Sequence, residues 1–107
     1  MQVIELSSVA NQSITVTPEV YQYTIAVRYF RDMMYAYIYD SAGNPISNGI
    51  RCCNGKWLIP YGARNYDGGG NFMFVDRDGK YPDFRNFGKT CSLVYYTREE
   101  IVNGETV

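Results

Sequence analysis

The side chains that most often perform chemistry are few in this sequence, and histidine is absent. Without histidine, the usual general base, the Ser/His and Cys/His pairs and the commonest metal ligand are missing. Acid–base chemistry would depend on carboxylates, which are densest at Asp76, Asp78 and Asp83. Asp76 and Asp78 have the alternate spacing with which a calcium loop begins, but the later ligands do not follow. We interpret Asp78-Gly79 as a turn, and expect no catalytic residue, no metal site and no cofactor.

Two further motifs are typical of phosphate or nucleic-acid binding. The run Asp-Gly-Gly-Gly at residues 67–70 offers backbone N–H groups, but it lacks a following Lys-Ser/Thr and a helix, so we interpret it as a loop tip. A stacking platform for single-stranded nucleic acid on a small barrel would use Arg64, Tyr66, Phe72, Phe74 and Arg77. Aromatic residues at alternate strand positions are more often core, and 10 basic against 11 acidic residues give no basic excess. Nucleic acid is therefore not an expected partner.

The three cysteines, Cys52, Cys53 and Cys91, are odd in number and lack C-x-x-C spacing. This pattern favours free thiols in a reducing compartment. A bond between the adjacent Cys52 and Cys53 would require a distorted peptide geometry. Cys91 begins a predicted strand, where we expect it to be a small buried hydrophobe.

The elements that must position these residues are almost all strands. Helix patterns are nearly absent from the 107 residues, whereas alternating β-rich runs bounded by turn signals recur. The predicted strands are residues 2–6, 12–17, 20–30, 33–40, 46–53, 56–59, 72–77 and 91–98. Gly49 is a candidate β-bulge, and Asn54-Gly55 a turn.

Short connections favour antiparallel neighbours. The sequence therefore predicts an all-β, single-domain, antiparallel β-barrel or sandwich of about seven or eight short strands over residues 1–98. Residues 60–71 and 78–90 are predicted loops, and residues 99–107 a polar C-terminal tail. No run of about 18 apolar residues is present, so we expect no membrane partner.

The strands 20–30 and 33–40 are close enough to form a tight hairpin around Arg31-Asp32, with partners whose numbers sum to 63. One face then pairs Tyr29 with Met34, Val27 with Ala36 and Ile25 with Ile38, which suits the core. The other face pairs Arg28 with Tyr35, Ala26 with Tyr37 and Thr24 with Tyr39. A loop of odd length would exchange the two faces and bury the tyrosines.

We favour the register that leaves Tyr35, Tyr37 and Tyr39 as an outward ladder with about 7 Å between successive rings. An exposed aromatic patch usually marks an interaction surface, and tyrosine gives contact area at modest entropy cost. The predicted partner-binding residues are Arg28, Tyr35, Tyr37, Tyr39, Arg64 and Tyr66. The alternative is that a neighbouring segment of the same domain covers the ladder.

The order and spacing of several motifs resemble the phage baseplate plug family of contractile-tail cyanophages and prophages. The motifs are MQVIELSSVANQSI (1–14), AVRYFRDMMYAYIYDSAGNPISNGIRCCNG (26–55), GGGNFMFVDRDG (68–79) and YPDFRNFGKTCSLVYY (81–96). Each motif alone is weakly specific, but together they cover about nine tenths of the chain. The chain departs from the family pattern at Cys52 and Cys53, where aliphatic residues are more typical, and in residues 99–107, which extend past the usual end.

The resemblance implies a structural, non-enzymatic plug of the virion tail baseplate, made in the host cytoplasm. Its expected partners are the hub and spike or tail-tube proteins, and it is expected to be oligomeric in the virion. The alternative is an OB-like β-barrel that binds an oligonucleotide or oligosaccharide. Strong, salt-dependent retention of single-stranded DNA would favour that alternative, and co-purification with a tail complex would favour the plug.

Overall fold

The computed structural model describes residues 1–19, 21–59 and 70–102. Within these residues the chain forms seven strands, one short 3₁₀ helix and one short α-helix. In chain order they are β1 (Gln2–Ile4), β2 (Gln12–Val16), β3 (Tyr23–Phe30), β4 (Met33–Tyr39), β5 (Pro45–Arg51), β6 (Asn71–Asp76), η1 (Phe84–Asn86), β7 (Cys91–Tyr96) and α1 (Arg98–Val102).

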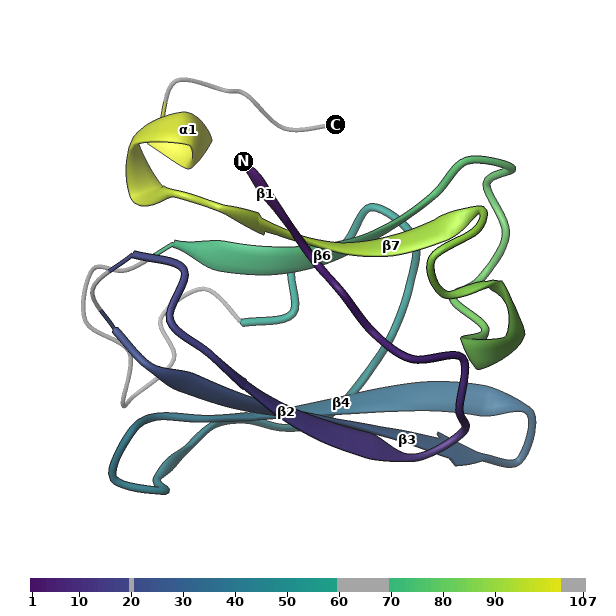
Figure 1. The fold of residues 1–107 in the computed structure, drawn as a ribbon, viewed down its shortest axis with the longest axis horizontal. Coiled ribbons are helices and arrows are strands. Elements are labelled where there is room, and N and C mark those ends of the chain that lie inside the picture. Colours follow the sequence, from purple (N-terminus) through teal and green to yellow (C-terminus); the bar gives the residue numbers. More distant parts are fainter. Residues whose placement is uncertain (20, 60–69, 103–107) are drawn as a thin grey trace.

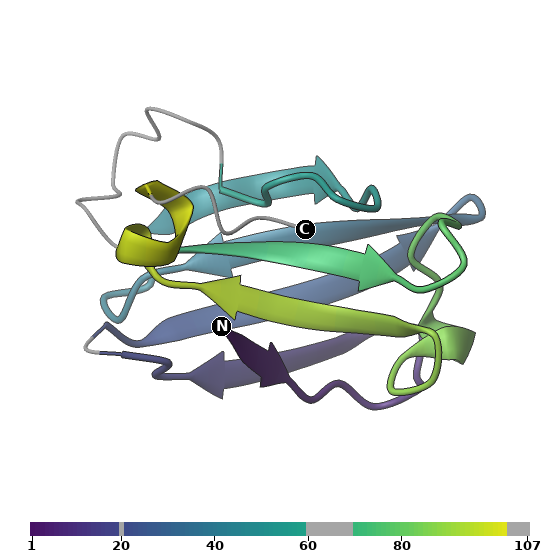
Figure 2. The same cartoon turned by 90° about the horizontal axis from the view of Figure 1, so that it is seen from above.

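The strands form two antiparallel sheets that face each other. Sheet A has the order β1-β7-β6 and sheet B the order β2-β3-β4-β5. Figure 1 shows sheet B as the lower layer and sheet A as the upper layer, and from above their strands run in broadly similar directions (Figure 2). The predicted all-β antiparallel fold is confirmed as a sandwich. The pairings of the described residues leave both sheets open, so they form no closed barrel.

The core lies between the sheets and follows from the alternation of the strands. Ile25, Val27, Ala36 and Ile38 are fully buried on the inward face of sheet B. Sheet A contributes large side chains to the same cluster, and an aromatic group links the two layers. In this group the ring of Tyr23 lies 5.3 Å from that of Phe72, and the ring of Phe72 lies 5.0 Å from that of Tyr95.

Residues 52–59 follow β5 and protect the outer edge of β6. The backbone N–H of Gly55 donates to the carbonyl of Phe74, and that of Leu58 to the carbonyl of Phe72, both at 2.9 Å. The predicted strand 56–59 is wrong, because this segment forms only an isolated bridge at Trp57. Leu58 and the residue after it are both buried, whereas successive side chains of a strand point to opposite faces.

Several predicted boundaries also differ. Strand 2–6 ends at Ile4 and strand 46–53 ends at Arg51. The predicted loop 78–90 contains η1, whose first turn is capped by the Asp83 carboxylate accepting from the N–H of Arg85. The described part of the predicted tail lies in α1, and the Glu100 carboxylate pairs with the amino group of Met1. The division into a domain of residues 1–98 and a tail of residues 99–107 stays a prediction.

The predicted bulge at Gly49 is confirmed. Ala36 pairs with Ile50 while Tyr37 pairs with Asn48, so Gly49 is the extra residue on β5. Its φ of 79° lies in the left-handed region, which glycine adopts without steric cost. A Cβ at this position would also lie 3.3 Å from the ring of Tyr37. Gly49 therefore allows the backbone conformation of the bulge and leaves room for the ring of Tyr37.

We expect Gly49→Ala to destabilise the protein more than Gly43→Ala. Both glycines have positive φ, which costs alanine about 1 kcal/mol. A Cβ at Gly43 would meet no atom within 4 Å, so Gly43→Ala isolates the backbone term. Urea unfolding of the two variants measures the difference, and equal losses would show that the contact with Tyr37 contributes nothing.

Candidate partner-binding face

The turn of the β3–β4 hairpin determines which side chains lie on the outer face of sheet B. Arg31 and Asp32 have φ values of 51° and 64°, so both occupy the left-handed conformation of a two-residue type I′ turn. The Tyr29 hydroxyl, which donates to Asp32 Oδ1 at 2.9 Å, helps to hold this turn. The predicted register is confirmed, with the outward pairs Arg28–Tyr35, Ala26–Tyr37 and Thr24–Tyr39.

Tyr35, Tyr37 and Tyr39 form the tyrosine ladder on this outer face. Each is half-buried, while the intervening residues of β4 are buried in the core. Tyr37 lies over Gly49 of the neighbouring strand, which explains part of its burial. The three tyrosines thus remain partly exposed and present surface to a partner.

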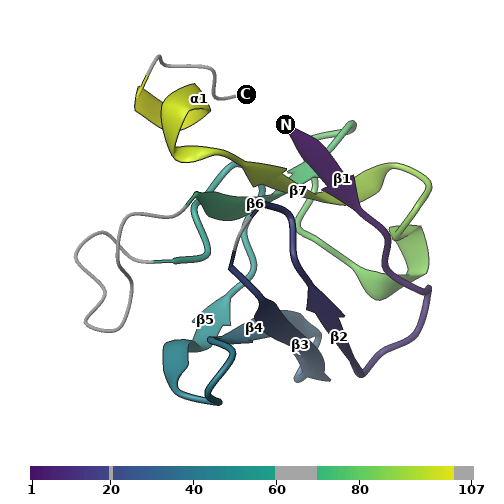
Figure 3. The ribbon, with the colours of Figure 1, turned by 60° about the vertical axis from the view of Figure 1, so that its left-hand side comes forward.

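No described element covers the outer face of sheet B. Figures 1 and 3 show sheet A and α1 on the opposite side of sheet B, and no described helix or strand below it. In the described part of the chain, nothing corresponds to the alternative in which a neighbouring segment covers the ladder. The face is therefore available for contact as far as these residues define it.

Two arginines, Arg28 and Arg51, lie beside the tyrosine ladder. Arg28 is exposed, and its Nη1 donates to the carbonyls of Gln12 at 3.0 Å and Val27 at 3.1 Å. Sequence reasoning missed Arg51, which pairs with Tyr35 from the β5 side and whose guanidinium lies 4.8 Å from the centre of the Tyr81 ring. The sequence pattern does not locate Arg51, because the register between β4 and β5 shifts twice before the two strands reach this pair.

The remaining predicted partner residues, Arg64 and Tyr66, lie outside the described residues, so their assignment stays a prediction.

The predicted turn at Asp78-Gly79 is confirmed, and the N–H of Gly79 donates to the carbonyl of Asp76 at 3.0 Å. Asp76 is buried, and its carboxylate accepts from the N–H of Lys80 at 2.8 Å, the hydroxyl of Thr90 at 3.1 Å and the N–H of Asp78 at 3.1 Å. Burial alone would raise the pKa of this carboxyl, but the hydrogen bonds outweigh burial and lower the pKa. Asp76 therefore organises the loop after β6 and is fully occupied in doing so.

We expect the stabilising effect of Asp76 to depend on pH. Because its folded-state pKa is lowered, its contribution is fully present above the unfolded pKa of about 3.9 and is lost as the pH falls through the folded value. Asp76→Asn keeps the size of the side chain but turns an amide N–H₂ toward donors. This should lower the free energy of unfolding by about 1–3 kcal/mol at pH 7.

Chemical denaturation from pH 7 to pH 2 measures this effect. The gap between wild type and Asp76→Asn should narrow as the pH drops, and a constant gap would contradict the assignment.

The stacking platform for nucleic acid does not form as its residues would require. Phe72 and Phe74 are fully buried between the sheets, so their rings cannot stack on bases. Phe74 instead stacks on Phe87 with 5.6 Å between the ring centres. The interpretation of Phe72 and Phe74 as core residues is confirmed.

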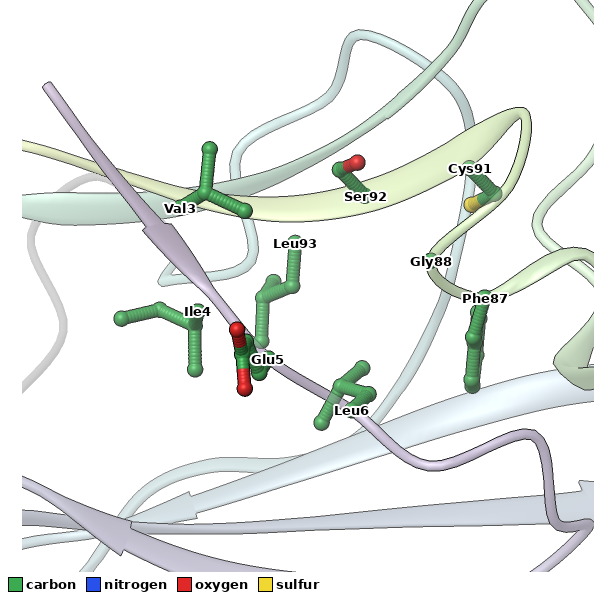
Figure 4. Close-up of a pocket in the computed structure, with 9 residues that line it drawn as sticks. All are labelled: Val3, Ile4, Glu5, Leu6, Phe87, Gly88, Cys91, Ser92 and Leu93. Carbon is green, nitrogen blue, oxygen red and sulfur yellow. The ribbon is translucent and has the colours of Figure 1, made fainter.

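A pocket of about 320 Å³ lies between the end of β1, where the chain turns away from β7, and the start of β7 (Figure 4). It was not predicted, because it arises from the early end of β1. Its lining is Val3, Ile4, Glu5, Leu6, Phe87, Gly88, Cys91, Ser92 and Leu93. Burial, together with the charge of Asp76, raises the pKa of the Cys91 thiol to about 11, so the thiol is protonated at neutral pH. The pocket therefore offers no activated nucleophile at this cysteine.

The three cysteines are free thiols. Cys52 and Cys91 are buried, and burial also raises the pKa of the Cys52 thiol far above its ordinary value. Cys53 is only half-buried. Cys91 is the small core residue that the sequence indicated.

We expect only Cys53 to react readily with iodoacetamide in the native protein, because the other two thiols are buried and protonated. After denaturation without reductant, all three should react. Mass spectrometry of the alkylated peptides measures both states. Rapid native labelling of Cys91, or recovery of a single thiol after denaturation, would contradict this expectation.

The described residues contain no group of three or more Cys, Asp or Glu side chains that could hold a metal ion. They also contain no helix long and apolar enough to span a membrane.

The fold and this face define a small antiparallel β-sandwich with a tyrosine-rich outer sheet. The family model described as cyanophage baseplate Pam3 plug gp18 matches residues 1–99, and the chain belongs to this family. The resemblance seen in the sequence is thereby confirmed. No curated protein matches the chain.

Membership assigns the chain a structural role in a phage baseplate. It also implies association with other baseplate or tail proteins and a location in the virion tail baseplate. A structural family suggests that the chain is not an enzyme. The match ends at residue 99, where the predicted polar tail begins.

Proposed function

We propose that the chain is a plug that packs against the hub and spike or tail-tube proteins of the baseplate through the outer face of sheet B. The observation that supports this role is the tyrosine ladder of β4, which is half-buried, regular and uncovered by any described element. Tyrosine provides rigid contact area and a hydroxyl for hydrogen bonding, which suits a surface that must hold a partner protein.

The burial pattern of β4 separates the residues that form the core from those that can contact a partner. The inward residues Met34, Ala36 and Ile38 are at most 2% exposed and hold the two sheets together. The outward tyrosines do not belong to either hydrophobic cluster of the described residues. Their removal should therefore affect contacts outside the domain more than its stability.

Further parts of the proposal concern the assembled particle. We include Arg64 and Tyr66 in the contact surface, an oligomeric arrangement in the virion and a tail of residues 99–107 that follows the domain. The chain would be made in the host cytoplasm, where its three free thiols would stay reduced. It would have no catalytic activity.

We expect Tyr37→Ser to prevent incorporation into tail particles while the domain stays folded, because Tyr37 is at the centre of the ladder. Ile38→Ser should instead unfold the domain, since truncating a fully buried isoleucine costs about 2–5 kcal/mol even without a buried hydroxyl. The measurement compares circular dichroism of each purified variant with its abundance in tails isolated from the phage or prophage that carries it.

Tyr21→Ser is the matched control, because Tyr21 is 55% exposed and precedes β3 rather than lying on the ladder. It should be incorporated like the wild type. Unfolding by Tyr37→Ser together with tolerance of Ile38→Ser would show that the faces are reversed. Normal incorporation of Tyr37→Ser would argue against the ladder as the docking surface.

A further inference from the structure

The outer face of sheet B has a charge of its own. The four strands of this sheet contain Arg28 and Arg51 and no Asp or Glu, although the whole chain has a net charge of −1. Three carboxylates lie in the connections between its strands, at Glu19, Asp32 and Asp40, and each accepts a hydrogen bond from a side chain or from the backbone of its own turn. The strands of this face therefore carry positive charge only, on a slightly acidic protein.

Both arginines are held in place but lack a carboxylate partner among the described residues, where the ion pairs involve other groups. Arg28 uses Nη1 for two backbone carbonyls, and the Arg51 guanidinium stacks on the ring of Tyr81. A guanidinium has five N–H donors, so each group keeps donors for an incoming anion. Their positions are partly fixed before binding, which lowers the entropy cost of using them.

The register places these side chains in one row across three strands. Arg28 is opposite Tyr35 on one side, and Arg51 is opposite Tyr35 on the other. Since neighbouring strands lie about 4.8 Å apart, the backbones that carry the two arginines are about 10 Å apart. Tyr81, which is 60% exposed, extends the row beyond Arg51.

We propose that the row Arg28–Tyr35–Arg51 receives an acidic protein surface of the baseplate, whose carboxylates pair with the two guanidinium groups on either side of Tyr35. This inference rests on the proposed docking face and adds the chemistry of the partner. Arginine pairs with carboxylates in a bidentate geometry, and complementary charge provides orientation as well as attraction. An acidic protein fits better than nucleic acid, because the chain has no basic excess and its family belongs to a protein assembly.

The test introduces Arg28→Glu together with Arg51→Glu and measures incorporation into isolated tail particles. Arg77→Glu together with Lys89→Glu is the matched control, because both residues are exposed beyond the end of β6 and the pair carries the same charge change. We expect the double variant to be incorporated at least tenfold less than the wild type and the control to be unaffected. Raising the salt concentration should weaken wild-type incorporation, since exposed charge pairs are screened.

A second variant and a solution measurement separate the possible explanations. Among the described residues the Arg51 side chain makes no hydrogen bond to the backbone, so Arg51→Glu alone replaces the double variant if circular dichroism shows that the latter is unfolded. Purified wild-type protein is titrated at low salt with poly-L-glutamate, poly-L-lysine and the oligonucleotide dT20. Binding of poly-L-glutamate alone, lost on charge reversal, is the expected result.

The outcomes distinguish this inference from the proposed function. If Tyr37→Ser fails to assemble but the arginine variants assemble normally, the docking face stands and the acidic partner is overturned. If the tyrosine and arginine variants both assemble normally, the docking face itself is overturned. Binding of dT20 without binding of poly-L-glutamate would overturn the acidic protein partner in favour of nucleic acid.

Discussion

A two-residue turn is the constraint on which the arrangement of this sandwich depends. Because the side chains of a strand alternate, one residue more or less between β3 and β4 would exchange the faces of one strand relative to the other. The left-handed conformations of Arg31 and Asp32 make the short turn possible without a glycine. The same turn thus places isoleucine and valine against sheet A and sends the tyrosines outward. Core and candidate contact surface are two results of one local geometry.

Polar side chains mostly organise loops in this protein and leave the sandwich to apolar packing. The Asn71 side chain brackets residue 59 by accepting from its N–H and donating to its carbonyl, both at 2.9 Å. Asp40 holds the turn between β4 and β5, and Asp76 holds the loop after β6. The carboxylates of Asp40 and Asp76 are therefore engaged by backbone donors of their own loops.

The sequence predicts the hairpin face closely because period-two alternation and turn length are both local properties. The pairing of Arg28 with Tyr35 follows from them without knowledge of the other sheet. Residues 56–59 are wrongly predicted as a strand, because their path depends on the edge of β6 and not on their own sequence pattern. Arg51 is not predicted for a related reason, since its position opposite Tyr35 depends on the register shifts between β4 and β5. The choice between sandwich and barrel likewise depends on which distant edges pair, which alternation cannot determine.

The bulge on β5 has a consequence for how the molecule behaves in a crowded assembly. β5 is an edge strand, and an edge strand with unpaired N–H and C=O groups is a template on which another chain can add and propagate aggregation. Gly49 interrupts the regular spacing of these groups, and Pro45 at the start of the strand has no N–H to offer. Strand addition along this edge is thereby discouraged, which limits open-ended sheet growth from β5. Protein contacts are then left to side chains, whose chemistry can discriminate one neighbour from another.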